Sequence, residues 1–194
     1  MRARLWAGVV CAGLAGAALA QTPSPALASY AIDPSHTFVH WEVVHLGTST
    51  IRGRFDRVRG NIGFDARTRQ IDVGVSVDIA SVSSGVPVLD GLLRGAEMLD
   101  AAAFPQAYFT ARGATFEADV PREIRGEFTL HGVSQPLTLH ATRWRCGLNP
   151  LFLREVCGGD FEATFERSAF GVRHSVPFVS DQVRLLVQIE AVHE

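Results

Sequence analysis

Lysine is absent from this chain of 194 residues, and all 18 of its basic side chains are arginines. Codon bias accounts for this absence as well as chemistry does, so we assign no function to it. A basic excess is also absent, because 20 acidic residues outnumber the arginines and the formal net charge is −2. Nucleic-acid binding depends on clustered positive charge that neutralises phosphates. The charge therefore argues against a nucleic acid as a partner.

Sequence signatures of catalysis are missing as well. The chain has no G-x-S-x-G, no H-E-x-x-H, no phosphate-binding loop and no dinucleotide-binding fingerprint. His36, His40 and His45 are candidate metal ligands, but His40 and His45 have opposite parity and point to opposite faces of a strand. We expect no catalytic residue, no metal site, no cofactor and no enzymatic activity.

Long hydrophobic runs are confined to the start of the chain. Arg2 and Arg4 precede an apolar run over residues 5–19, which ends in the small-x-small sequence Ala18-Leu19-Ala20. The run is too short to span a bilayer, and this pattern is typical of a cleaved secretory signal. Its removal leaves 16 arginines against 20 acids, a net charge of −4. The expected division is a signal peptide (1–20), a linker (21–29) and one domain (30–192).

Alternation of apolar and polar residues dominates the remaining sequence. Its clearest example places Ile71, Val73, Val75, Val77 and Ile79 on one face of a strand and polar residues on the other. Such one-sided strands are typical of antiparallel sheets, and closing the sheet hides both the apolar face and the edges. We therefore predict an all-β protein, an eight-stranded antiparallel barrel that can hold one apolar ligand. The predicted strands cover 37–45, 51–64, 71–79, 107–114, 124–130, 137–143, 160–166 and 183–191.

Two features interrupt this pattern. Gly53 and Gly60 within 51–64 predict a bend or bulge. Around residues 88–99, Leu89, Leu92 and Leu93 recur at helical spacing and predict a short helical segment that covers one end of the barrel.

Two cysteines remain after the signal. Cys146 and Cys157 bracket the turn-rich sequence Gly147-Leu148-Asn149-Pro150, and an even pair in an exported chain predicts a disulfide that closes a loop. A reactive or metal-bound thiol pair is the alternative.

His45 and a run of arginines are the polar features with two interpretations. His45 shares its parity with Trp41 and Val43, so it is either a core histidine or a hydrogen-bonding group for the polar end of a ligand. Arg52, Arg54, Arg57 and Arg59 form either a solvated strand face or a contact for a pyrophosphate or an anionic bilayer.

Several motifs resemble those of one known family. Tyr30-x-Ile32-Asp33-x-x-His36-Thr37 is followed by Val39-x-Trp41-x-Val43-x-His45-Leu46-Gly47, then Leu93-Arg94 with Phe104-Pro105-Gln106-Ala107-x-Phe109, then Gly126-x-Phe128-Thr129-Leu130-x-Gly132-Val133-Ser134 and Arg167-Ser168-x-Phe170-Gly171. In this order they resemble the YceI-like family of bacterial polyisoprenoid-binding proteins, over about residues 30 to 192. Leu92 and Ala169 depart from the usual pattern, where a histidine and an acid often stand.

The resemblance implies a lipocalin-like barrel whose apolar tunnel holds a long isoprenoid, either a quinone or a polyprenyl phosphate, in a periplasmic binding or carrier protein. Isoprenoid lipid is then the expected partner, with transient contacts to a membrane surface or to membrane proteins, and the oligomeric state stays open. We expect the tunnel to be lined by Val39, Trp41, Val43, His45, Val75, Val77, Phe109, Gly126, Phe128, Leu130 and Leu139. The alternatives are a hydrolase or isomerase that uses a pocket histidine, and a filled barrel that acts as a scaffold.

Overall fold

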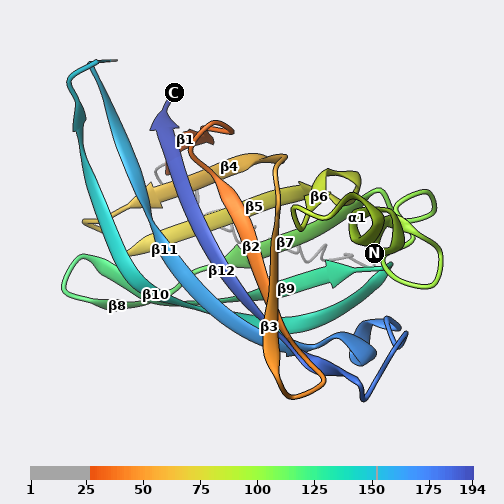
Figure 1. Cartoon of the computed structure of the whole chain (residues 1–194). Helices are drawn as coiled ribbons and strands as arrows, with labels where there is room; N and C mark the ends of the chain where they lie inside the picture. Colours follow the sequence, from red (N-terminus) through yellow and green to blue (C-terminus); the bar gives the residue numbers. More distant parts are fainter. Residues whose placement is uncertain (1–26, 152) are drawn as a thin grey trace, which may run out of the picture.

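The structure is a computed structural model that describes residues 27–151 and 153–194 (Figure 1). The predicted signal peptide and most of the predicted linker lie outside these residues. The strands of the described part are β1 (Ala28–Ile32), β2 (Phe38–His45), β3 (Ser49–Phe55), β4 (Val58–Asp65), β5 (Gln70–Asp78), β6 (Val82–Ser83), β7 (Gln106–Arg112), β8 (Thr115–Glu117), β9 (Val120–Leu130), β10 (Val133–Asn149), β11 (Arg154–Glu166) and β12 (Val179–His193). The helices there are α1 (Pro87–Arg94) and the short 3-10 turns η1 (Ile79–Ser81) and η2 (Arg167–Phe170).

Eight of these strands form a closed antiparallel ring, as predicted. Their order is β1-β4-β5-β7-β9-β10-β11-β12, and the ring closes where β1 pairs with the end of β12. Tyr30 lies opposite His193, and Ile32 opposite Ala191. Closure leaves the ring with no free edge, so every one-sided strand can turn its apolar face inward.

Short interruptions within strands explain why the described part has more strands than the ring. β2, β3 and β6 extend the ring at one end, where β2 pairs with the first part of β12. After a short interruption, β2 continues the line of β1, β3 that of β4, and β6 that of β5. For this reason β1 and β2 both pair with the same edge of β12. The predicted strand 51–64 is thus two strands, which break at Asp56 and Arg57. The break lies between Gly53 and Gly60, the residues that predicted a bend.

α1 covers the end of the barrel to which β6 belongs (Figure 1). Pro87 occupies the first turn, where its missing N–H costs nothing, and Leu89 and Leu93 pack against the barrel core, whereas Leu92 is 45% exposed. Arg94 holds the helix in place by donating to the carbonyl oxygens of Ala80 and Val82, both at 3.0 Å. We call α1 and the turns up to residue 105 the lid. No helix in the described residues is long and apolar enough to cross a membrane.

β10 and β11 continue beyond the opposite end of the barrel as a hairpin (Figure 1). The pairing of β9 with β10 ends at His140, whereas β10 and β11 stay paired as far as Asn149 and Arg154. The predicted strands 137–143 and 160–166 are therefore too short. Their alternation weakens beyond the barrel because no core lies beneath the hairpin.

The predicted disulfide is present between Cys146 and Cys157, and the short segment that it closes is mostly a paired hairpin instead of an irregular loop. The two cysteines lie directly opposite each other in the β10–β11 ladder, and the turn follows several residues later. The bond therefore joins two strands of the hairpin where the barrel ends.

Candidate functional site

An apolar cavity of about 300 Å³ lies beneath the lid. Its wall is formed by residues of β2 and β3, of the neighbouring β12, and of β9 and β11. The lid contributes Leu89, Leu92, Leu93, Met98 and Leu99. The volume is at the lower end of the range for ligand pockets, which are mostly apolar with a few polar groups. We call this space the mouth cavity.

A second, smaller cavity of about 70 Å³ lies deeper in the barrel. Val39, Val77, Phe128 and Leu185 line both cavities and so form the boundary between them. Beyond the small cavity the barrel is filled with aromatic side chains: the ring centroid of Trp144 lies 5.4 Å from that of Phe64 and 6.0 Å from that of Phe161. The predicted tunnel is therefore open at one end and packed at the other.

The predicted lining residues divide between these two spaces. Trp41, Val43, His45 and Leu130 line the mouth cavity alone. Val75, Phe109 and Leu139 line only the small inner cavity. Val39, Val77 and Phe128 line both.

Gly126 lies outside the linings of both cavities. A Cβ atom at this position would stand 2.4 Å from the carbonyl oxygen of Thr110 and 2.6 Å from the ring of Phe109. The glycine thus lets β7 and β9 approach each other, with Phe109 packed over its backbone. Its small size indicates close packing here, not open space.

Four polar residues line the otherwise apolar mouth cavity: His45, Arg167, His174 and Ser175. Arg167 is only 5% exposed and donates to the carbonyl oxygens of Ser180, Val172, His174 and Val179 at 2.8–3.1 Å. Its guanidinium thus fixes the loop between η2 and β12, which forms part of the cavity wall. Burial lowers the pKa of Arg167, and the nearby Asp181 opposes this change.

Asp181 secures the start of the same loop. Its carboxylate accepts hydrogen bonds from the backbone N–H of Ser168 at 2.8 Å and from the Ser168 hydroxyl at 2.5 Å. The hydroxyl bond is the larger cause of the lowered pKa of Asp181. The ionised carboxylate therefore stabilises the loop that Arg167 holds from the other side.

Trp41 contributes a buried donor to the cavity wall. The residue is 8% exposed, and its indole Nε1 has no hydrogen-bond partner among the described residues. Its ring packs over Gly53, where a Cβ atom would stand 2.3 Å from Cζ2. A buried donor without a partner is costly, and a ligand oxygen within reach would satisfy it.

His174 also links the loop to the lid. Its Nδ1 lies 3.3 Å from a carboxylate oxygen of Glu97, which follows α1 in the chain. This contact crosses the rim of the cavity, and both side chains are partly exposed. Exposed pairs are weak, so the contact can break when a ligand enters.

The other polar candidates from the sequence lie away from the cavity. Arg52, Arg54 and Arg57 pair with Glu42, Asp56 and Asp78 at 2.6–2.9 Å, as expected for a solvated strand face. His36 does not meet His40 or His45. Its Nδ1 lies 2.7 Å from Asp33 and 4.0 Å from Glu190, at the turn between β1 and β2.

The sequence pattern did not identify the lid leucines, Arg167, His174 or Ser175 as lining residues. The sequence did mark Arg167, because this residue is the first of the motif Arg167-Ser168-x-Phe170-Gly171. It did not mark His174 and Ser175, since they lie in an irregular loop where no periodicity reveals the direction of a side chain.

Comparison with known proteins decides the family. A family model described as the YceI-like domain matches residues 30–191. This chain belongs to the YceI-like family. Protein YceI of Salmonella arizonae is 33% identical over 176 residues, which cover 89% of this chain and 91% of that protein, and Protein YceI of Salmonella paratyphi B matches equally well.

Solved structures share the YceI-like fold. BcnA of Burkholderia cenocepacia matches with a TM-score of 0.68 and 19% identity, over 82% of this chain and 99% of that chain. A polyisoprenoid binding domain from Saccharophagus degradans, implicated in plant cell wall breakdown, matches with a TM-score of 0.61 and 17% identity, over 87% of this chain and 99% of that chain.

Proposed function

We propose that this protein is a periplasmic binding or carrier protein for a long-chain isoprenoid lipid of the quinone or polyprenyl-phosphate type, and that it has no catalytic role. The apolar mouth cavity, with polar groups only at a few points of its wall, is the observation that carries the proposal. Membership of the YceI-like family supports it, as does the likeness to a polyisoprenoid binding domain.

The apolar chain of the ligand would lie against the aliphatic and aromatic side chains of the wall. Burial contributes about 25 cal/mol per Å² of apolar surface, so a few isoprene units provide useful affinity without any specific contact. Val39, Val77, Phe128 and Leu185 would limit how far the chain reaches. A longer chain would need these four side chains to move apart.

The polar head would lie near the rim. His45, His174 and Ser175 offer hydrogen-bonding groups there, and the guanidinium of Arg167 adds positive charge behind them. The free indole N–H of Trp41 favours a ligand that carries an oxygen atom close to its chain. A quinone carbonyl or a phosphate ester oxygen has this chemistry, and a plain hydrocarbon does not.

Mass spectrometry of an organic extract is the direct test. The protein purified from its native periplasm should release an isoprenoid lipid. Val43→Phe, which adds bulk inside the mouth cavity, should lower the lipid occupancy, whereas Val44→Phe on the exposed side of the same strand should not. An extract without isoprenoid, or equal occupancy in the two variants, would contradict the proposal.

The head group can be tested separately. Trp41→Phe keeps an aromatic ring but removes the N–H, and His45→Ala removes the imidazole. Each should weaken binding of a quinone several-fold and leave binding of a hydrocarbon of equal length nearly unchanged, as a thermal-shift titration would reveal. Equal losses for both ligands would mean that these residues only support the fold.

A further inference from the structure

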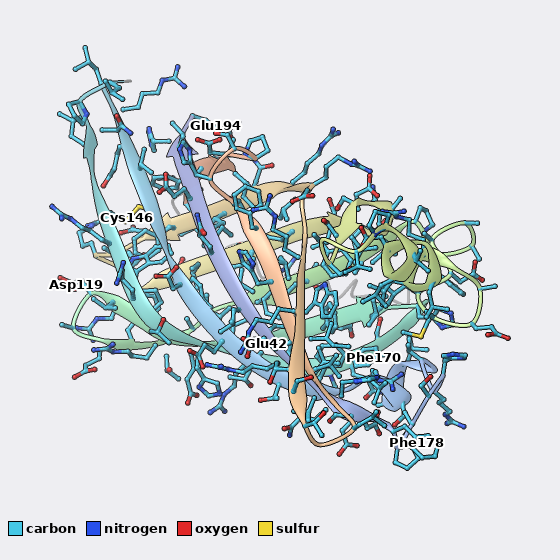
Figure 2. All side chains as sticks on the ribbon, viewed as in Figure 1. Glu42, Asp119, Cys146, Phe170, Phe178 and Glu194 are labelled. Atoms are coloured by element: carbon cyan, nitrogen blue, oxygen red, sulfur yellow. A yellow bond between two sulfur atoms is a disulfide. The ribbon has the colours of Figure 1, made fainter. Side chains whose placement is uncertain are left out.

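The hairpin of β10 and β11 has no role in the proposed lipid site. It projects from the end of the barrel opposite the lid, and Figure 2 shows Cys146 and Phe178 at opposite ends of the molecule. Beyond Val156, β11 has lost its pairing with β12, and beyond His140, β10 has lost its pairing with β9. The tip is therefore a two-stranded ribbon, a structure that is marginal in water without further support.

The disulfide supplies that support. Cys146 and Cys157 are cross-strand partners in the last stretch of the ribbon that the barrel still supports, because Cys157 is 2% exposed and pairs with Ala191 of β12. The covalent bond therefore anchors the base of the projecting tip to the barrel. The position of the bond indicates that the tip must keep its shape while it projects into the surroundings.

The tip itself is apolar. Leu148, Leu151 and Leu153 are 68%, 85% and 76% exposed. They come from the end of β10, from the turn and from the residue before β11, so all three lie at the far end of the hairpin. A small apolar cluster at the end of a narrow ribbon fits insertion into a lipid interface.

Arginines flank this apolar tip. Arg143, Arg145 and Arg154 are exposed, and the sequence between residues 143 and 154 contains no acidic residue. Arg143 has only a long contact with Asp160, at 3.8 Å. Cations placed just behind an apolar segment are complementary to anionic lipid head groups, with the apolar segment reaching the acyl boundary.

We propose that the hairpin tip, residues 145–151 and 153–154, docks the barrel onto an anionic phospholipid bilayer. The leucines enter the interface, Arg145 and Arg154 lie at the level of the head groups, and Arg143 adds positive charge farther back on the hairpin. Because the hairpin projects away from the lid, the docked barrel directs its mouth cavity away from that bilayer. The tip is then a tether, separate from the path by which a ligand enters. The proposal does not depend on which ligand the cavity binds.

Vesicle co-sedimentation of the full protein tests the proposal. Binding is expected to vesicles of phosphatidylethanolamine with phosphatidylglycerol, not to vesicles of phosphatidylcholine alone, and added salt should weaken it because screening shortens the reach of the charges. Arg145→Gln with Arg154→Gln should weaken binding about tenfold or more. Leu148→Ser with Leu151→Ser and Leu153→Ser should have a similar effect. These side chains are exposed, so circular dichroism should be unchanged.

Matched variants elsewhere separate this tip from other surfaces. Arg57→Gln with Arg59→Gln removes two charges from the barrel wall, and Val88→Ser removes a side chain of the lid that is 85% exposed. Both should bind vesicles like the unchanged protein. The proposal is overturned if the protein does not bind the anionic vesicles, if the hairpin variants bind them normally, or if the lid variant is the one that loses binding. Capture of a protein by the hairpin without any vesicle binding would also overturn it.

Discussion

The two ends of this barrel are built from the same kind of strand, yet one end is open and the other is filled. At the lid end, aliphatic and aromatic side chains and a loop held by Arg167 surround a cavity of about 300 Å³. At the hairpin end, Phe64, Trp144 and Phe161 pack edge to face. Alternation therefore decides which side chains point inward, whereas their size and the covering segments decide whether a space remains.

Removing a side chain should lower the free energy of unfolding more at the packed end than at the open end. Two phenylalanines of β11 test this prediction. Phe161 is 3% exposed and contacts Trp144, so Phe161→Ala should lower the free energy of unfolding by about 3–5 kcal/mol. Phe165 lines the mouth cavity and is only half-buried, so Phe165→Ala should cost at least about 1 kcal/mol less. Urea denaturation measures both, and equal losses would mean that the two ends are equally packed.

Arg167 should be the most sensitive polar position at the open end. Arg167→Met removes the donor for four carbonyl oxygens and should lower the free energy of unfolding by about 2–3 kcal/mol. Amide hydrogen exchange should rise in the loop between η2 and β12 and stay unchanged in the hairpin. Arg167→Lys should restore little, because an ammonium group cannot reach all four acceptors. Full rescue by lysine would show that charge alone matters.

The disulfide should affect the hairpin far more than the barrel. Loop closure over so short a ring is estimated at about 3 kcal/mol. Because the hairpin can separate without unfolding the barrel, Cys146→Ala with Cys157→Ala should lower global stability by much less than that. Hydrogen exchange should rise only in the projecting part of the hairpin, between the two cysteine positions. Alkylation of the unreduced protein should find no free thiol at either cysteine. Loss of folding in the double variant would contradict this description of the hairpin.

The sequence predicts the strands and their ring, but it does not predict which end of the barrel is open. The barrel, the number of strands in its ring, the helical segment and the cysteine pair are predictable, because periodicity and residue spacing act locally along the chain, although β1 is not among the predicted strands. The extent of the cavity is not predictable. Gly126 suggested open space but accommodates Phe109, and His174 reaches the cavity through a loop whose shape depends on Arg167. Such features depend on contacts between residues far apart in the sequence, which periodicity does not reveal.

The turn between β1 and β2 joins the ring to its extension, and it contains two titratable side chains, Asp33 and His36, that shift each other's pKa. A hydrogen bond with Asp33 raises the pKa of His36, and hydrogen bonds from Ser35 and then His36 lower the pKa of Asp33. The protonated His36 stabilises the fold at low pH, and this contribution is lost as the pH rises through its folded pKa. The ionised Asp33 contributes above its unfolded pKa, and its contribution is lost as the pH falls through its folded pKa. The pair therefore stabilises the turn most between these two limits.

His40 provides the internal comparison for this last prediction. Burial, and then the charge of Arg54, lower the pKa of His40, so the two histidines should titrate on opposite sides of the ordinary value. NMR titration of the imidazole protons should find the pKa of His36 above that of His40. Asp33→Asn should lower the pKa of His36 and leave that of His40 unchanged, because Asp33 contacts only His36 of the two. Since His36 is exposed, we expect only a small change in unfolding free energy. A shift of both histidines in this variant would mean that the substitution disturbs β2 as a whole instead of a single turn.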